Sequence, residues 1–252
     1  MGQYTDFLGP QELRTRGTII VVPGRGETRE TYTRLGKRLA ADAYRVRIVD
    51  APRIDEADVK GSLARLADEL AIAAETTEDG EPRRPVVLLG ADSGAATVTA
   101  LIEGTVEGGW SDAVVLAGLP GRAVGVTTSW DEELDIRTSC AVHRGVLSGD
   151  AAVERGTLGV PLPDDLLDIA YAGTSEIPQL VLIGDADPLA DREALARAVK
   201  TSKAARLSVV RGAHHDVLND LQHRSVAAEI VSFLETLRND LVPLISVESS
   251  AW

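Results

Sequence analysis

Three polar side chains that could cooperate in a hydrolytic reaction each follow a short apolar run of the sequence. Asp92 follows VVLLGA, Asp187 follows LVLIGDA, and His215 follows SVVRGAH. A histidine can transfer protons for a nucleophilic side chain, and a carboxylate can orient and charge-stabilise that histidine. Because each residue comes just after a strand-like run, we expect the three to meet at one edge of a sheet as a catalytic triad.

The segment LLGADSGAA indicates a tight strand-to-helix turn that presents one reactive side chain. The residues two positions to either side of the tip must be small, because the strand and helix backbones approach closely there. With Asp92 at the tip those residues are Gly90 and Gly94, and with Ser93 at the tip both are alanines. Glycine suits the strained backbone better, which favours Asp92. Ser93 stays open as an alternative nucleophile, and an acidic helix cap without chemistry is a third interpretation.

The segment TIIVVPGRGETRETY is a strand followed by a glycine-rich turn, whose backbone N–H groups suit an oxyanion hole. Gly24 and Gly26, with Asp50 at the end of the next strand, also match part of a dinucleotide-binding fingerprint. Arg29 occupies the place of the third glycine. We therefore expect no nucleotide cofactor.

Strand-length apolar runs alternate with stretches of helical period along most of the chain. The predicted strands are residues 18–22, 44–50, 85–89, 112–118, 180–184 and 205–210, and the predicted helices lie near 31–42, 59–70, from 94 onward, 191–201 and 226–237. This alternation is typical of a mostly parallel, doubly wound α/β sheet with helices on both faces.

Residues 119–177 interrupt the alternation, because they contain three prolines, scattered aromatic residues and no clear strand. An insertion of this length is usually functional. We expect it to form a small cap over the carboxyl ends of the strands, where open α/β sheets bind ligands. Residues 1–118 and 178–252 would then form the core.

Three segments resemble motifs of monoacylglycerol lipases and bacterial lysophospholipases, which are α/β-hydrolases. PGRGETRETY is similar to their HGxGExxxRY segment, GDAD to their GxxD turn, and GAHHDVLND to their GxxHExxxxE segment. The chain order of nucleophile, acid and histidine is also that of this superfamily. The resemblance implies the α/β-hydrolase fold, with His215 as base and Asp187 as acid. It also implies an oxyanion hole made by the backbone N–H groups of Arg25 and Ser93.

The elbow departs from the GxSxG motif of those lipases, since Asp92 stands in the place of the serine. LGADSGAA is similar instead to the aspartate elbow of epoxide hydrolases and haloalkane dehalogenases. That resemblance implies attack of the carboxylate on saturated carbon, followed by hydrolysis of the alkyl ester by a histidine-activated water. Ser93 stands where the dehalogenases have a halide-binding tryptophan, which favours an epoxide.

Opening of an epoxide also needs a proton donor for the leaving oxygen. Trp130, His143 and Tyr171 in the insertion are the candidates for contact with the substrate. Arg25 is expected to contribute its backbone to the oxyanion hole, and its side chain could also meet an anionic substrate.

The sequence therefore predicts a cofactor-free hydrolase for a small, mostly apolar organic molecule, with an Asp92–His215–Asp187 triad. A Ser93-dependent esterase or lysophospholipase-like enzyme is one alternative. A lyase or cyclase that uses the triad only for proton transfer is another, and a binding module without activity is a third. We expect no metal site, because the adjacent His214 and His215 lack the spacing of metal ligands.

The overall composition limits the partners. A formal net charge of −13 over 252 residues argues against binding to nucleic acid or anionic membranes. One cysteine, no N-terminal apolar segment and no apolar run of membrane-spanning length predict a cytoplasmic protein that does not insert into a membrane. The apolar tail DLVPLISVESSAW is expected either to pack on the domain or to form a homodimer contact.

Overall fold

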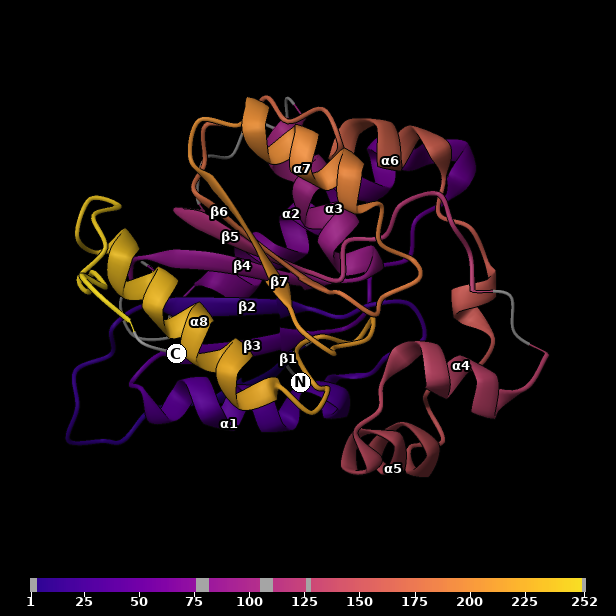
Figure 1. Ribbon diagram of the computed structural model, residues 1–252, viewed down its shortest axis with the longest axis horizontal. Coiled ribbons are helices and arrows are strands. Elements are labelled where there is room, and N and C mark those ends of the chain that lie inside the picture. The colour runs from indigo at the N-terminus through magenta and orange to yellow at the C-terminus, as the bar shows by residue number, and fades with distance from the viewer. Residues whose placement is uncertain (1–3, 76–81, 105–110, 126–127, 251–252) are drawn as a thin grey trace.

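A seven-stranded sheet with the strand order β1-β3-β2-β4-β5-β6-β7 forms the centre of the computed structural model, which describes residues 4–75, 82–104, 111–125 and 128–250 (Figure 1). The strands are β1 Tyr4–Phe7, β2 Thr18–Val22, β3 Arg45–Val49, β4 Val86–Ala91, β5 Ala113–Ala117, β6 Gln179–Gly184 and β7 Ala205–Val210. Only β1 is antiparallel to its neighbour, β3. The mostly parallel α/β sheet predicted from the sequence is confirmed.

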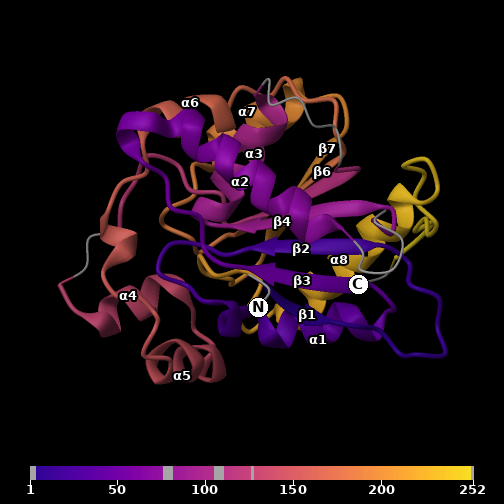
Figure 2. The ribbon, with the colours of Figure 1, turned by 180° about the vertical axis from the view of Figure 1, so that it is seen from behind.

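Helices cover both faces of the sheet because its central strands are apolar on both faces. All residues of β2, β4 and β5 are buried. Ile20 and Val22 point to one face, which is covered by α2 (Val59–Ala74), α3 (Ser93–Glu103), α6 (Asp164–Ala170) and α7 (Arg192–Thr201). Ile19 and Val21 point to the other face, under α1 (Thr33–Ala41) and α8 (His223–Leu237). Figure 2 shows the same two helical layers from behind.

The strand β1 was not predicted from the sequence. It is only four residues long, YTDF, and it lacks the apolar run by which the other six strands were found. It pairs along the outer edge of β3, with Tyr4 opposite Val49. The strand β1 therefore depends on backbone pairing with a strand that is distant in sequence, and the local sequence pattern does not predict it.

The described residues of the segment 119–177 form four short helical elements. They are α4 Trp130–Arg137, α5 Ala141–Gly149, the 3₁₀ turn η3 Thr157–Gly159, and α6. Helices α4 and α5 stand off the sheet and share a small apolar cluster made by Leu134, Leu147 and Val153 (Figure 1). Helix α6 packs on α3 in the helical layer. The boundaries of a cap within this segment stay a prediction.

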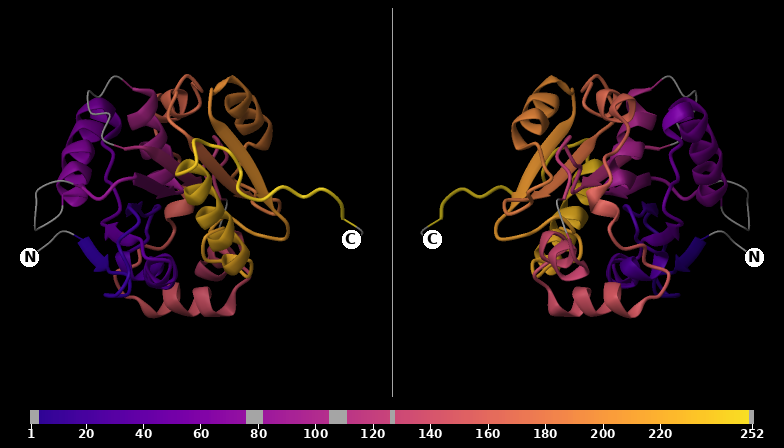
Figure 3. Two further views of the ribbon diagram at one scale, coloured as in Figure 1. Left: turned by 90° about the vertical axis from the view of Figure 1, so that its left-hand side faces the viewer. Right: turned by 90° about the vertical axis from the view of Figure 1, so that its right-hand side faces the viewer.

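The C-terminal tail runs away from the body of the molecule (Figure 3). Leu244, Ile245 and Val247 are 61%, 84% and 78% exposed. The expectation that the tail packs on its own domain is therefore wrong for these side chains, because most of their surface is exposed. A homodimer contact through the tail stays a prediction. Among the helices that the structure describes, none combines the length and apolar character needed to cross a bilayer.

We predict that exposed apolar side chains of the tail drive dimerisation, since isolated apolar patches of this kind favour association. Light scattering coupled to size exclusion should give about twice the monomer mass of 26.7 kDa at micromolar protein. Ile245→Asp should weaken the dimer by about tenfold or more, because a charge would be buried in the contact. Val142→Asp, at an exposed apolar position on α5, is the matched control. A mass of one chain at every concentration would show that the tail has another role.

Candidate active site

Asp92 forms the tip of a tight turn between β4 and α3, with φ 47° and ψ −117°. A positive φ is uncommon outside glycine and marks a strained position. A Cβ on Gly90 would lie 2.4 Å from the carbonyl oxygen of Gly94, and one on Gly94 would lie 2.2 Å from that of Val22. Both positions therefore need glycine. The turn places Asp92 at its tip and Ser93 one residue further, as the first residue of α3.

The three residues proposed as a triad lie together. His215 Nε2 lies 3.1 Å from Oδ1 of Asp92, and His215 Nδ1 lies 2.9 Å from Oδ2 of Asp187. The side chains come from the loops after β4, β6 and β7, and all three residues are buried. His214 is turned elsewhere, because its Nδ1 lies 3.0 Å from Oδ2 of Asp220.

Arg25, in the loop after β2, holds the whole carboxylate of Asp92. Its backbone N–H donates to Oδ2 at 2.8 Å, its Nε donates to Oδ2 at 2.9 Å, and its Nη2 donates to Oδ1 at 2.8 Å. The backbone N–H expected to line an oxyanion hole thus meets a carboxylate oxygen. The remaining guanidinium nitrogen, Nη1, donates to the carbonyl oxygen of Val160 in the 119–177 segment. A bidentate guanidinium–carboxylate pair is among the stronger polar contacts in proteins.

These contacts set the charges of the site. Burial opposes ionisation of Asp92, but Arg25 and the hydrogen bond from His215 outweigh it and hold the pKa of that carboxyl well below its usual range. Burial likewise opposes the charge on His215, but the carboxylates of Asp187 and Asp92 raise the pKa of its imidazole to about 10. At neutral pH the resting site therefore contains an imidazolium between two carboxylates.

A second buried polar cluster lies next to the triad. Asp216 accepts a hydrogen bond from His143 Nε2 at 2.8 Å, and its Oδ1 lies 3.6 Å from Arg137 Nη1. Glu27 accepts hydrogen bonds from the backbone N–H of Gly24 at 2.8 Å and from the hydroxyl of a neighbouring tyrosine, so it braces the loop that carries Arg25. Burial and the nearby carboxylate of Asp216 raise the pKa of Glu27 to about 7.

Glu27, His143 and Asp216 have the arrangement of metal ligands, since their ligand atoms lie within 4.8 Å of one another. Two carboxylates and an imidazole are a suitable donor set for a divalent cation. The guanidinium of Arg137, however, is completely buried beside Asp216 and already supplies positive charge there. We therefore assign this cluster a structural role.

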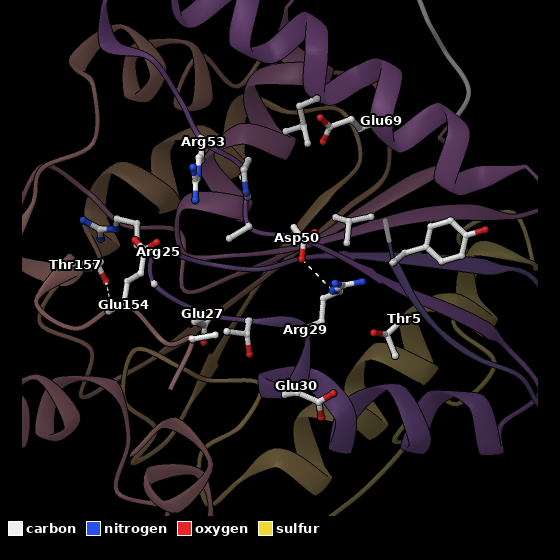
Figure 4. Close-up of a pocket in the computed structure, with 18 of the residues that line it drawn as sticks. Thr5, Arg25, Glu27, Arg29, Glu30, Asp50, Arg53, Glu69, Glu154 and Thr157 are labelled. Carbon is white, nitrogen blue, oxygen red and sulfur yellow. Dashed lines mark hydrogen bonds and ion pairs between the residues drawn. The ribbon is translucent and has the colours of Figure 1, made fainter. Parts of the chain in front are cut away.

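Two cavities adjoin the site. A cleft of about 1550 Å³ lies between the loops after β2 and β3 and the 119–177 segment, and Arg25 lines it (Figure 4). A small cavity of about 10 Å³, the volume needed for one water molecule, is lined by Asp92, His215, Glu27 and Asp216 among others. Asp92 does not line the large cleft. Arg25 therefore stands between the cleft and the carboxylate.

None of the three residues proposed for substrate contact is among the residues that line the two cavities. Trp130 Nε1 donates to the hydroxyl of Ser148 at 3.0 Å, and the ring packs against the apolar cluster of α4 and α5. The hydroxyl of Tyr171 donates to the carbonyl oxygen of Pro120 at 3.1 Å. His143 belongs to the second polar cluster. The structure does not bring these side chains to Asp92.

A sequence model described as "Alpha/beta hydrolase family" matches residues 19–229 of this chain. The chain belongs to the alpha/beta hydrolase family. The match spans β2 to α8, and with them every strand that carries a residue of the site. As a member of this family, the protein is a hydrolase. No curated protein matches the sequence significantly.

Solved structures agree with this alpha/beta hydrolase fold. A monoacylglycerol lipase from Paleococcus ferrophilus superposes with a TM-score of 0.70 and 19% identity, over 93% of this chain and 98% of that chain. A soluble variant of a monoglyceride lipase from Saccharomyces cerevisiae superposes with a TM-score of 0.70 and 14% identity, over 93% and 91%. A carboxylesterase from Bacillus subtilis gives 0.61 and 15%, over 90% and 85%. At these identities the likeness concerns the fold alone.

The charge state of the triad in this hydrolase can be measured directly. The pKa of His215 in the folded protein is about 10, above the ordinary value of 6.5. Folding thus favours the charged ring, and this stabilisation is complete below pH 6.5 and is lost as the pH rises to about 10. Nitrogen NMR of labelled histidine should therefore show His215 as imidazolium at neutral pH. The Asp92→Asn substitution should lower the midpoint of the His215 titration.

His223 provides the internal reference for that titration. Its pKa is lowered from 6.5 by partial burial and by nearby Arg34, so it should lose its proton below that pH. If His215 titrates together with His223, the charge arrangement described above is wrong.

Proposed function

We propose that the protein hydrolyses an epoxide through a covalent ester on Asp92. The observation that carries this proposal is the position of a carboxylate at the strained tip of the elbow, 3.1 Å from the Nε2 atom of His215. In that position the carboxylate has the placement of a nucleophile, and the histidine is within proton-transfer distance. Asp187 orients the imidazole from its other nitrogen at 2.9 Å.

An aspartate nucleophile favours reaction at saturated carbon. Attack of a carboxylate on an sp³ carbon gives a stable alkyl ester, whereas attack on an ester carbonyl would give a reactive mixed anhydride. Ordinary lipase chemistry is therefore unfavourable with Asp92 at the tip. Ser93 lies in the first turn of α3, and His215 contacts Asp92. This arrangement supports the aspartate rather than the serine as the nucleophile.

The resting protonation state supplies the acid that an epoxide needs. An oxygen of Asp92 attacks one epoxide carbon, the carbon–oxygen bond breaks, and the alkoxide takes the Nε2 proton of the His215 imidazolium. The ester on Asp92 is now neutral, so one of the charges that raised the pKa of His215 is gone. The neutral imidazole can then accept a proton from the water that attacks the ester carbonyl.

Collapse of that tetrahedral intermediate completes the cycle. The second alkoxide leaves and takes the remaining proton of the attacking water, which regenerates the carboxylate of Asp92 and releases a diol. His215 keeps the proton that it accepted, as in the resting state. Ser93 N–H, at the start of α3 where helix N–H groups have no helical partner, is proposed to stabilise the oxyanion together with the N–H of Arg25.

The covalent intermediate is the test of this function. His215→Ala should reduce turnover of styrene oxide by about 10³-fold, because both proton transfers are lost. The ester should then accumulate slowly, and intact-protein mass spectrometry should show a gain equal to the whole epoxide. Asp92→Asn should show no gain, Ser93→Ala should behave like the parent, and His214→Ala should keep most activity.

The alternatives give different readouts in the same experiment. If the protein is an esterase, an activated ester should leave only its acyl group on Ser93. If it is a lyase or cyclase, no part of the substrate should remain on the protein. In heavy-oxygen water, a single turnover through Asp92 should give largely unlabelled diol and a labelled carboxylate. Label wholly in the first diol would exclude the ester route.

A further inference from the structure

Arg25 closes the route from the cleft to the nucleophile. Its guanidinium and backbone N–H occupy both carboxylate oxygens of Asp92, and His215 approaches one of the same oxygens. The side chain of Arg25 lines the cleft, and Asp92 does not. A molecule that enters the cleft therefore meets Arg25 first. The epoxide carbon can reach Asp92 only after the guanidinium has moved.

The charge of the ligand decides whether that movement is favourable. The side chain of Arg25 is only 11% exposed, so it is poorly solvated. A neutral ligand that displaced it would leave a cation without its partner in a partly buried site, which is strongly unfavourable. A ligand with its own anionic group would pair with the guanidinium as it leaves Asp92. The guanidinium would then keep an ion-pair partner, and His215 would remain as the charged partner of Asp92.

We propose that Arg25 binds a carboxylate on the substrate, and that this exchange of partners releases Asp92 for attack. The inference rests on the proposed epoxide hydrolysis and names its substrate class, an epoxide with a nearby carboxylate. Arg25 is a specificity-determining residue in this scheme. Arg25 recognises the anionic group of the substrate. It stays paired with Asp92 while the cleft contains no anion.

The walls of the cleft support an anion at this end. Arg53 lines the same cleft and has no ion-pair partner among the residues that the structure describes. Figure 4 shows it above Arg25 in the left half of the view. Arg29, by contrast, is paired with Asp50 at 2.9 Å. The lining also includes the acidic side chains of Glu30, Asp50, Glu69, Asp150 and Glu154, of which Glu154 lies at the same end as Arg25.

Contacts with the 119–177 segment keep Arg25 in place for the exchange. Its Nη1 donates to the carbonyl oxygen of Val160, and its own carbonyl oxygen accepts from Arg137 Nη2 at 3.0 Å. Neither contact involves Asp92. The backbone contact with Arg137 can therefore remain while the guanidinium turns from the carboxylate toward the cleft, and the contact of Nη1 with Val160 turns with the guanidinium.

The test compares styrene oxide with its para-carboxylate, which differ only in charge and the added group. In the parent enzyme, kcat/KM should be at least about tenfold higher for the carboxylate, as expected when a buried charge gains a partner. Arg25→Met should remove this preference. Arg29→Met, in the same cleft, is the matched control and should keep it. A preference for neutral styrene oxide in the parent, or a preference that survives Arg25→Met, would overturn the proposal.

A binding measurement separates this inference from the proposed chemistry. In Asp92→Asn, Arg25 has lost its partner, so benzoate should bind at least about tenfold more tightly than to the parent in calorimetry. Adding Arg25→Met to that variant should abolish the gain. Tight benzoate binding without turnover of either epoxide would support the anion site and contradict the proposed function. Turnover of neutral epoxide without any benzoate binding would support the function and overturn the anion site.

Discussion

The ionised carboxylate of Asp92 is the constraint on which the rest of the site depends. A carboxylate that is only 4% exposed needs full compensation, because burial of an unpaired charge is costly. Arg25 and His215 supply it from two loops, after β2 and β7, that are far apart in sequence. The elbow in turn needs Gly90 and Gly94, since any side chain there would collide with backbone. The parallel sheet brings these loops together, because the carboxyl ends of its strands lie at one edge.

Buried charges outside the triad are paired as well. Arg137, on α4, is fully buried, and it pairs with Glu133 at 2.8 Å, lies near Asp216, and donates to the carbonyl oxygen of Arg25. The 119–177 segment thus holds the loop whose Arg25 pairs with the carboxylate of Asp92. Changes in α4 can therefore alter the position of Arg25 without touching Asp92. This link couples the segment to Asp92 through Arg25.

Much of the core could be predicted from the sequence, since β2, β4, β5 and β6 are apolar runs that are buried along their whole length, whereas β1 has no such run. The meeting of Asp92, Asp187 and His215 could also be predicted, because each follows a predicted strand. The ion pair between Arg25 and Asp92 could not, since a side-chain contact across 67 residues leaves no local pattern. The same holds for His143, which was expected near the substrate and instead pairs with Asp216.

The net charge of the site links the two proposals. In the resting state Asp92 and Asp187 carry two negative charges, and Arg25 and His215 carry two positive charges. Opening of an epoxide neutralises Asp92, and transfer of the His215 proton to the alkoxide neutralises the imidazole, so the balance is kept. Expulsion of a halide would remove the charge of Asp92 and leave the imidazolium in place. A substrate carboxylate on Arg25 adds one negative charge before and after the opening alike. A buried site with little solvent to adjust its charge therefore favours a reaction that moves a proton with each covalent step.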